Sequence, residues 1–187
     1  RRNNMTDTAN VIVGKPKVGG AVWVAPVGTS LPTDATSVIN TAFKSLGYIS
    51  EDGVTNAPSM SSETKKAWGG DVVATIDNGT ENKYKMKFIE TLNAEVQKLV
   101  YGDSNVTDEV GSMSVANKGI NTTPHAFVID MVMAKNLIHR MVIPSASITE
   151  IGDIKYVDSD VAGYEVTLTA KADTDGATAH YYYQKAG

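Results

Sequence analysis

The chain has 187 residues, a net charge of −4 and no cysteine. The lack of cysteine excludes a disulfide framework, a thiol nucleophile and a metal site built on thiolates. The acidic balance disfavours electrostatic binding of nucleic acid. Because no apolar run approaches the ~20 residues of a membrane span, we expect no membrane partner.

The composition favours strands over helices. Val and Ile total 33 residues against 6 Leu, and Thr adds 19 more. β-Branched side chains fit a pleated sheet better than a helix because they are stiff at χ1. The sequence therefore predicts a mainly β fold, a β-sandwich or barrel, with one flanking α-helix.

We expect a polar, glycine-rich N-terminal arm at residues 1–19 and a single β domain at residues 20–187. Met5 followed by Thr6 is typical of a natural start, so residues 1–4 are interpreted as a non-native addition or an upstream start. The first strands are predicted at residues 21–25, ending before Pro26, and at residues 46–50.

Residues 53–70 are predicted to form a long loop. Ordinary connections run about 4–6 residues, and longer loops are usually functional or disordered. Trp and Met are enriched at protein interfaces, so exposed copies on such a loop indicate a partner. We therefore expect this loop to contact a partner. Its apolar residues are Val54, Pro58, Met60 and Trp68.

Residues 71–90 are predicted to form a β-hairpin that turns at Asn78-Gly79, because both residues tolerate positive φ. A two-residue loop would mix the faces. A loop of three or five residues places Val72, Ala74 and Ile76 on the face of Tyr84, Met86 and Phe88, and three lysines on the other face. The longer loop is therefore favoured.

A helix is expected directly after this hairpin. Thr91 is the predicted N-cap, and Leu92, Val96 and Leu99 fall at helical spacing. Gly102 is the predicted stop. At about 10 residues the helix is too short to be stable alone, so its apolar stripe must pack on the sheet.

The second half of the chain reads as strands. A central buried strand is expected at residues 125–134, where Asp130 is the single charged residue. Further strands are predicted at residues 137–143, ending at Pro144, at 147–157 with an interruption at Gly152-Asp153, at 164–171 and at 178–183.

The sequence carries little that points to catalysis. The three histidines, His125, His139 and His180, lack metal-ligand spacing, and the acidic pairs lie where turns favour Asp. No nucleophile elbow or phosphate loop is present. We therefore expect no catalytic residue, no cofactor and no metal, and an enzyme is disfavoured.

Several segments resemble the major tail tube proteins of long-tailed bacteriophages, especially of the siphophage type. The most specific part is the run LPTDAT followed by LGYISEDGV, at residues 31–36 and 46–54. Further similar segments lie at residues 22–30, 42–45, 68–73, 88–93, 142–146 and 164–169.

This resemblance implies a structural virion protein. Tail tube proteins of this kind typically form rings of six copies that stack into a hollow tube. In such a tube the loop at residues 53–70 is expected to make the inter-ring contact through Val54, Pro58, Met60 and Trp68, with Met60 and Trp68 as its anchors. The implied partners are other copies of the chain, the tape-measure protein, the tail terminator and tip proteins, and DNA that passes through the lumen without specific binding. The implied location is the virion tail, after assembly in the cytoplasm of the bacterial host.

Two alternatives stay open from the sequence. One is a tube protein of a phage-like contractile particle or secretion system. The other, less favoured because the chain starts with a polar segment, is a secreted β-sandwich binding module.

Overall fold

The computed structural model describes residues 14–16, 21–133, 137–159 and 161–185. These residues are mainly strand. The elements are β1 (Gly14–Pro16), β2 (Val22–Pro26), β3 (Lys44–Ser45), β4 (Thr55–Lys66), β5 (Val72–Phe88), α1 (Ala94–Tyr101), the 3-10 turn η2 (Asp103–Asn105), β6 (Val106–Glu109), β7 (Ser112–Val115), β8 (His125–Met133), β9 (Leu137–Ile151), β10 (Tyr164–Ala170) and β11 (His180–Lys185).

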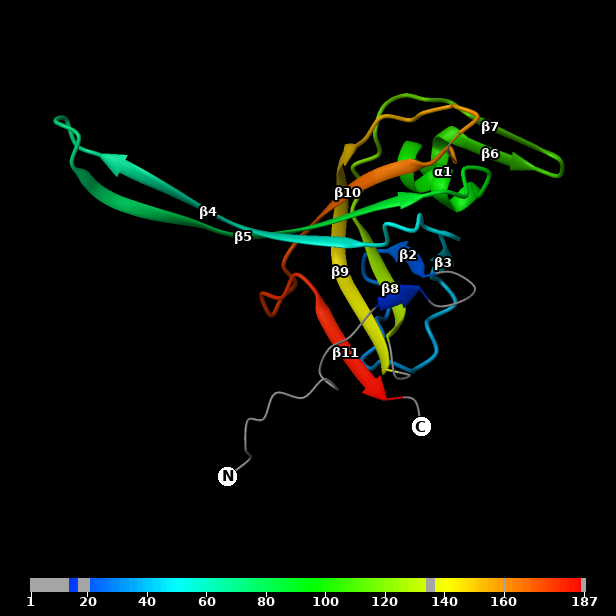
Figure 1. The fold of residues 1–187 in the computed structure, drawn as a ribbon, viewed down its shortest axis with the longest axis horizontal. Helices are drawn as coiled ribbons and strands as arrows, with labels where there is room; N and C mark the ends of the chain where they lie inside the picture. Colours follow the sequence, from blue (N-terminus) through cyan, green and yellow to red (C-terminus); the bar gives the residue numbers. More distant parts are fainter. Residues whose placement is uncertain (1–13, 17–20, 134–136, 160, 186–187) are drawn as a thin grey trace.

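Nine of the described strands form one antiparallel sheet. Its order is β3-β2-β8-β9-β10-β5-β4, with β1 paired to β8 and β11 paired to β9. Strands β6 and β7 form a separate two-stranded sheet beside α1 (Figure 1). The prediction of a mainly β fold with a flanking helix is confirmed.

The sheet closes on itself through residues 44–50. The amide of Leu46 donates to the Val22 carbonyl (2.9 Å) at one end of this segment. At the other end the amides of Ser50 and Ile89 donate to the carbonyls of Lys87 and Tyr48. The segment thus joins β2 to β5 and completes a small barrel. The predicted strand at 46–50 is reduced to a bridge at Ile49, because the chain turns at Gly47, whose φ is 71°.

The barrel interior is the main hydrophobic core. Tyr84, Met86 and Phe88 of β5 point into it, as predicted, and Val166 and Leu168 of β10 lie opposite. Helix α1 packs its buried face on this core. The buried apolar side chains of that face are Val96, Leu99 and Val100.

The helix begins later than predicted. Its N-cap is Asn93, whose side-chain oxygen accepts a hydrogen bond from the Glu95 amide (3.0 Å), so the predicted cap at Thr91 is wrong. Leu92 lies before the helix and is 86% exposed, so it is not part of the buried stripe. The helix ends at Gly102, as predicted, with φ 93°.

Strand β9 is a single 15-residue strand where two strands were predicted. On one side it pairs with β11 up to Val142 and with β10 from Ala146 onward. Pro144 falls between these two partners, and the ladder with β8 carries a bulge at the same level. A proline that lacks an N–H is tolerated at such a bulge, so it bends the strand without ending it.

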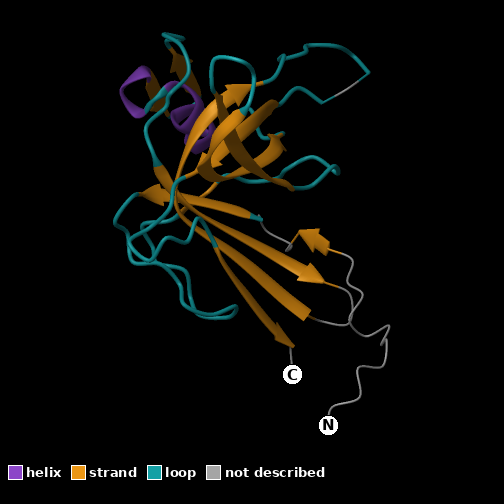
Figure 2. Cartoon of the chain, turned by 90° about the vertical axis from the view of Figure 1, so that its left-hand side faces the viewer, coloured by secondary structure: helices purple, strands orange, loops and turns teal. Residues whose placement is uncertain are grey.

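A second, smaller core lies on the outer face of β8 and β9. Phe43 and Leu31, from the segment that follows β2, pack there against Val128 and Val142. Strand β8 is therefore covered on both faces, as its nearly continuous apolar sequence predicted. Figure 2 shows the resulting shape, with the helix at one end of the body and the strands diverging toward the other.

The N-terminal strand β1 falls inside the predicted arm. Gly14–Pro16 pairs with Met133–Met131 of β8. Residues 1–13 and 17–19, and the connection at residues 134–136 between β8 and β9, lie outside the described residues. The division into arm and domain stays a prediction.

Candidate assembly surface

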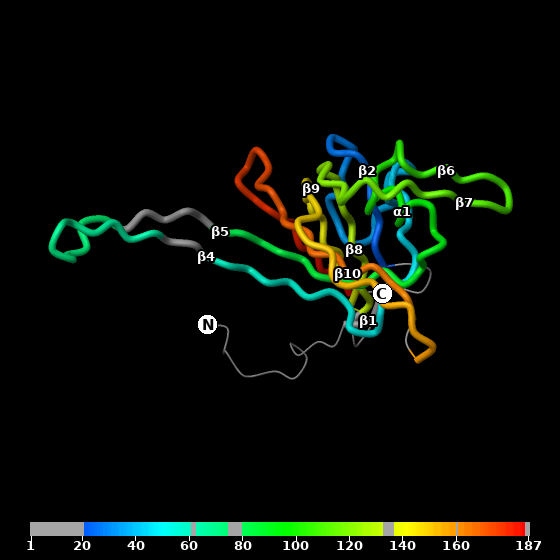
Figure 3. Tube along the Cα trace, turned by 90° about the horizontal axis from the view of Figure 1, so that it is seen from above, coloured from blue at the N-terminus to red at the C-terminus, as the bar shows by residue number. Residues whose placement is uncertain are grey.

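The most prominent feature of the molecule is a long hairpin made of β4 and β5. Its ladder runs from Thr55, opposite Lys85, to Lys66, opposite Val72. Beyond the barrel it projects into solvent as an isolated two-stranded ribbon (Figures 1 and 3). A ribbon of this kind is marginal alone in water, so it needs support from its base or from a partner.

This hairpin corrects two predictions. Residues 55–66, expected to be loop, form β4, and the chain turns at residues 67–71. The Asn78-Gly79 segment, expected to be the turn, lies within β5. The actual turn uses Gly69 and Gly70, with φ of 126° and 98°, which only glycine adopts readily.

The base of the hairpin is fixed to the body by polar contacts. The Asn56 amide nitrogen donates to the Tyr181 hydroxyl (3.1 Å), which lies 2.8 Å from the Tyr84 hydroxyl. Burial, followed by the hydrogen bond with Tyr181, raises the pKa of the Tyr84 phenol, so it stays protonated. The β11 strand therefore holds the hairpin at its root.

A surface ion pair adds to this anchorage. Lys85 of β5 contacts Glu165 of β10 at 2.5 Å, and this contact raises the pKa of the lysine. Lys83 similarly contacts Glu81 at 3.2 Å. The lysine face predicted for this strand is therefore the outer face of the body, and Lys83 and Lys85 on it lie beside carboxylates.

The four predicted interface residues lie at different heights along the hairpin. Val54, at its start, is half-buried and packs against the main core. Pro58 is exposed on β4, the edge strand, where a missing N–H is tolerated. Met60 is 79% exposed midway along β4, and Trp68, in the turn, is fully exposed.

The exposed apolar side chains of the hairpin make it a candidate surface for association with a partner. Besides Met60 and Trp68, Val72 and Val73 are more than half exposed. Contiguous exposed apolar groups, and a long edge strand, are what soluble proteins avoid unless a partner covers them. Lys65 and Lys66 stand beside the turn on the same edge strand.

A second, shorter hairpin was missed from the sequence. It consists of β6 and β7 and turns at Val110-Gly111. Asp108, Glu109 and Val110 are exposed at its tip. A glycine between two short runs that each contain valine was the available signal, and Gly111 indeed has φ 84°.

The structure also places the three histidines. His125, the first residue of β8, contacts the loop that precedes this strand: its Nδ1 lies 2.9 Å from the Thr123 carbonyl oxygen. His139 is buried and stacks on Tyr183, with the ring centroids 4.1 Å apart. His180 contacts Asp173 (2.8 Å), and this contact, with backbone amides, lowers the pKa of that carboxyl. Each histidine thus has a different partner in these contacts.

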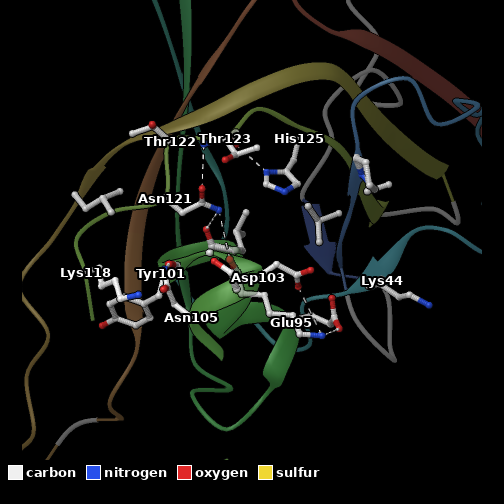
Figure 4. A pocket seen from close by; sticks show the side chains of 18 of the residues that line it. Lys44, Glu95, Tyr101, Asp103, Asn105, Lys118, Asn121, Thr122, Thr123 and His125 are labelled. Carbon is white, nitrogen blue, oxygen red and sulfur yellow. Dashed lines mark hydrogen bonds and ion pairs between the residues drawn. The ribbon is translucent and has the colours of Figure 1, made fainter. Parts of the chain in front are cut away.

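The described residues offer little for other kinds of site. Among the described residues no cluster of three His, Cys, Asp or Glu side chains could hold a metal ion. In the same part of the chain, no helix has the length and apolar character needed to cross a membrane. An open groove beside α1 is lined by mixed polar and apolar residues (Figure 4).

Comparison with known proteins assigns the chain to a family. No curated protein matches the chain. A family model described as phage tail tube protein matches residues 5–186, nearly the whole sequence. Together with the mainly β fold, this match shows that the chain belongs to the phage tail tube protein family.

Proposed function

We propose that copies of this chain assemble into rings, six to a ring, which stack into the hollow tube of a phage tail. The family establishes a structural tail tube protein of the virion. The ring, its sixfold symmetry, passage of DNA through the lumen and assembly in the host cytoplasm belong to the proposal. So do the tape-measure, terminator and tip proteins as partners.

The observation that carries the proposal is the long hairpin. It exposes Met60, Trp68, Val72 and Val73 on a ribbon that extends well beyond its own barrel. A subunit that projects such a ribbon can reach a neighbour, and the neighbour can bury its apolar groups. Head-to-tail contacts of this type form closed rings or continuing filaments, depending on the rotation between copies.

We propose that the hairpin makes the contact between adjacent rings, with Met60 and Trp68 as its anchors. Val54 supports it from the body, and Pro58 lies on the edge strand between the base and Met60. Large apolar side chains that fill a pocket on a partner commonly dominate the binding energy of an interface.

Negative-stain electron microscopy of the purified chain tests the proposal. The wild-type protein is expected to form rings or tubes. The double variant Met60→Ser, Trp68→Ser is expected to stay folded, because both side chains are already exposed, but to form no tubes. The matched control changes two exposed apolar residues outside the hairpin, Val38→Ser and Tyr48→Ser, and should still assemble.

Two results contradict the proposal. A wild-type chain that stays monomeric at high concentration, under all salt conditions, argues against a tube. Normal tubes from the Met60/Trp68 double variant argue against the hairpin as the contact between rings.

A further inference from the structure

The two hairpins of the chain lie at opposite ends of the molecule. The long hairpin of β4 and β5 projects from one end of the longest axis, and the short hairpin of β6 and β7 projects from the other (Figures 1 and 3). A subunit that repeats head to tail must carry a donor surface at one end and a matching acceptor at the other. The short-hairpin end is therefore the place to look for an acceptor.

The donor tip combines one large apolar side chain with charges of known sign. Trp68 is fully exposed in the turn. Lys65 and Lys66 precede it on β4, and Asp71 follows it, all of them exposed. Glu63 contacts Lys65 at 2.5 Å. Lys66 is the positive charge nearest to the tryptophan along the chain.

The acceptor end carries an open groove of about 1010 Å³. It lies between the end of β2, helix α1 and residues 118–123 (Figure 4). Its apolar lining includes Val24, Leu99 and Ile120, of which Ile120 is half exposed. Such a groove offers an indole ring both apolar contact and polar neighbours for its N–H.

The charges around the groove complement those of the hairpin tip. Asp103 lines the groove, and its side chain is 88% exposed. The chain runs from there through η2 into β6, which adds Asp108 and Glu109 at the short hairpin. Lys118 also lines the groove and provides the opposite charge for Asp71.

Other charged groups limit where the donor lysines can lie. Lys44 and Lys98 also line the groove, and Lys98 contacts Glu95 at 3.0 Å. These cations repel Lys65 and Lys66 if the lysines enter the groove. The lysines are therefore placed over the short hairpin while the tryptophan enters the groove.

We propose that Trp68 of one copy fills this groove on a second copy in the adjacent ring, and that Lys65 and Lys66 pair with Asp108 and Glu109 of that copy. This inference rests on the proposed tube function and names the surface that receives the hairpin. The tryptophan supplies apolar burial, and the charges fix the register of one copy on the next.

A cysteine pair tests the contact directly, because the native chain has no cysteine to interfere. In the variant Ala67→Cys, Ile120→Cys, each copy carries one cysteine beside Trp68 and one in the groove. Oxidation after assembly should give a ladder of covalent multimers on a non-reducing gel. The matched control, Ala67→Cys, Asp175→Cys, moves the second cysteine to an exposed turn and should give no ladder.

Charge reversal provides a second, independent measurement. Lys65→Glu with Lys66→Glu should reduce the assembled fraction about tenfold or more, and so should Asp108→Lys with Glu109→Lys. All four changes in one chain should restore assembly, since they rebuild the pairs with inverted signs. All the altered side chains are exposed, so circular dichroism should show an unchanged fold.

The outcomes separate this inference from the function on which it rests. If tubes form but the cross-link does not, or if the charge-reversed variants assemble like the wild type, the groove is not the acceptor. Neither result contradicts the proposed tube function. A wild-type chain that never assembles overturns both.

Discussion

Asp130 of β8 and Arg140 of β9 face each other across the ladder and form a buried, two-pronged ion pair. The guanidinium Nε lies 2.6 Å from Oδ1 and Nη2 lies 2.9 Å from Oδ2, and both side chains are 3% exposed. Nη1 of the same arginine donates to the carbonyl of Ser37 (2.8 Å). The pair therefore fastens the segment after β2 to the outer face of the sheet.

Breaking this pair should destabilise the fold strongly. Arg140→Met removes the charge that balances the buried Asp130 carboxylate, and losses of about 3–5 kcal/mol are typical for one partner of a buried pair. Urea unfolding followed by circular dichroism measures the loss. Lys85→Met, which breaks an ion pair at the surface, is the control and should have a far smaller effect. Equal losses from both variants would contradict the structural role given to Asp130 and Arg140.

Gly47 and Gly53 provide a matched test of the segment that closes the barrel. Both have φ 71°, so Ala at either position strains the backbone by about 1–2 kcal/mol. A Cβ at Gly53 meets open space, whereas one at Gly47 would overlap the Glu90 carboxylate. That carboxylate accepts a hydrogen bond from the Tyr48 amide (2.8 Å).

Gly47→Ala should therefore lower the free energy of unfolding by more than Gly53→Ala does. The difference reports the displacement of Glu90 from the closing segment, and thermal unfolding of the two variants measures it. If the two glycines prove equally sensitive, the contact between Glu90 and the segment does not support the closure.

The start of α1 can be tested by mutation, because the sequence predicts Thr91 as its N-cap whereas the structure has Asn93 there. Asn93→Ala removes the side-chain acceptor of the Glu95 amide and should reduce stability by about 1 kcal/mol, as loss of an N-cap usually does. Thr91→Ala should have little effect, because Thr91 makes its hydrogen bonds through the backbone: its carbonyl accepts from the Gln97 side chain and its amide donates to the Ile89 carbonyl. A greater loss at Thr91 than at Asn93 would reverse the assignment. Urea unfolding of both variants decides between them.

The sequence predicted the core strands because burial leaves a periodic pattern. Tyr164, Val166, Leu168 and Ala170 alternate with polar residues and are buried in β10, within the strand predicted at residues 164–171. The helix was found by the spacing of Val96 and Leu99, although its cap was placed two residues early. Several strand ends differ by a residue or two, where pairing with neighbours decides the boundary.

The long hairpin was mispredicted because β4 has no buried face. From Thr55 to Lys66 the strand is mostly polar, and it is exposed where its side chains are described, so no alternation of apolar residues marks it. Two turn signals competed, Gly69-Gly70 and Asn78-Gly79, and local preference alone could not rank them. The register with β5, a long-range property, selects the first.

The proposed assembly surface could be predicted only in part, because one half of it combines residues that are far apart in the sequence. Exposed Met60 and Trp68 could be singled out by residue type, and the structure places both on the hairpin. The groove beside α1 combines residues 24, 99 and 120, which are far apart in the sequence, so no local pattern reveals it. A surface of the kind proposed for the groove leaves little trace in the periodicity that a single chain's own core imposes.

His139 gives the fold a predicted dependence on pH. Burial lowers its pKa below the usual value of about 6.5, so the folded chain holds the imidazole neutral. As pH falls through about 6.5, the unfolded chain binds a proton there while the folded chain does not. Stability from the neutral histidine is thus present above that pH and is lost as pH falls through the lowered pKa.

Replacing this histidine should flatten that dependence. His139→Phe keeps a ring to stack on Tyr183 and removes the titrating group. Between pH 7 and pH 5 the free energy of unfolding of the wild type should fall more steeply than that of the variant. Between pH 7 and pH 8 the difference between the two proteins should stay constant, which serves as the internal control. Parallel curves down to pH 5 would show that His139 is protonated as readily in the fold as in the unfolded chain, and urea unfolding at a series of pH values distinguishes the two results.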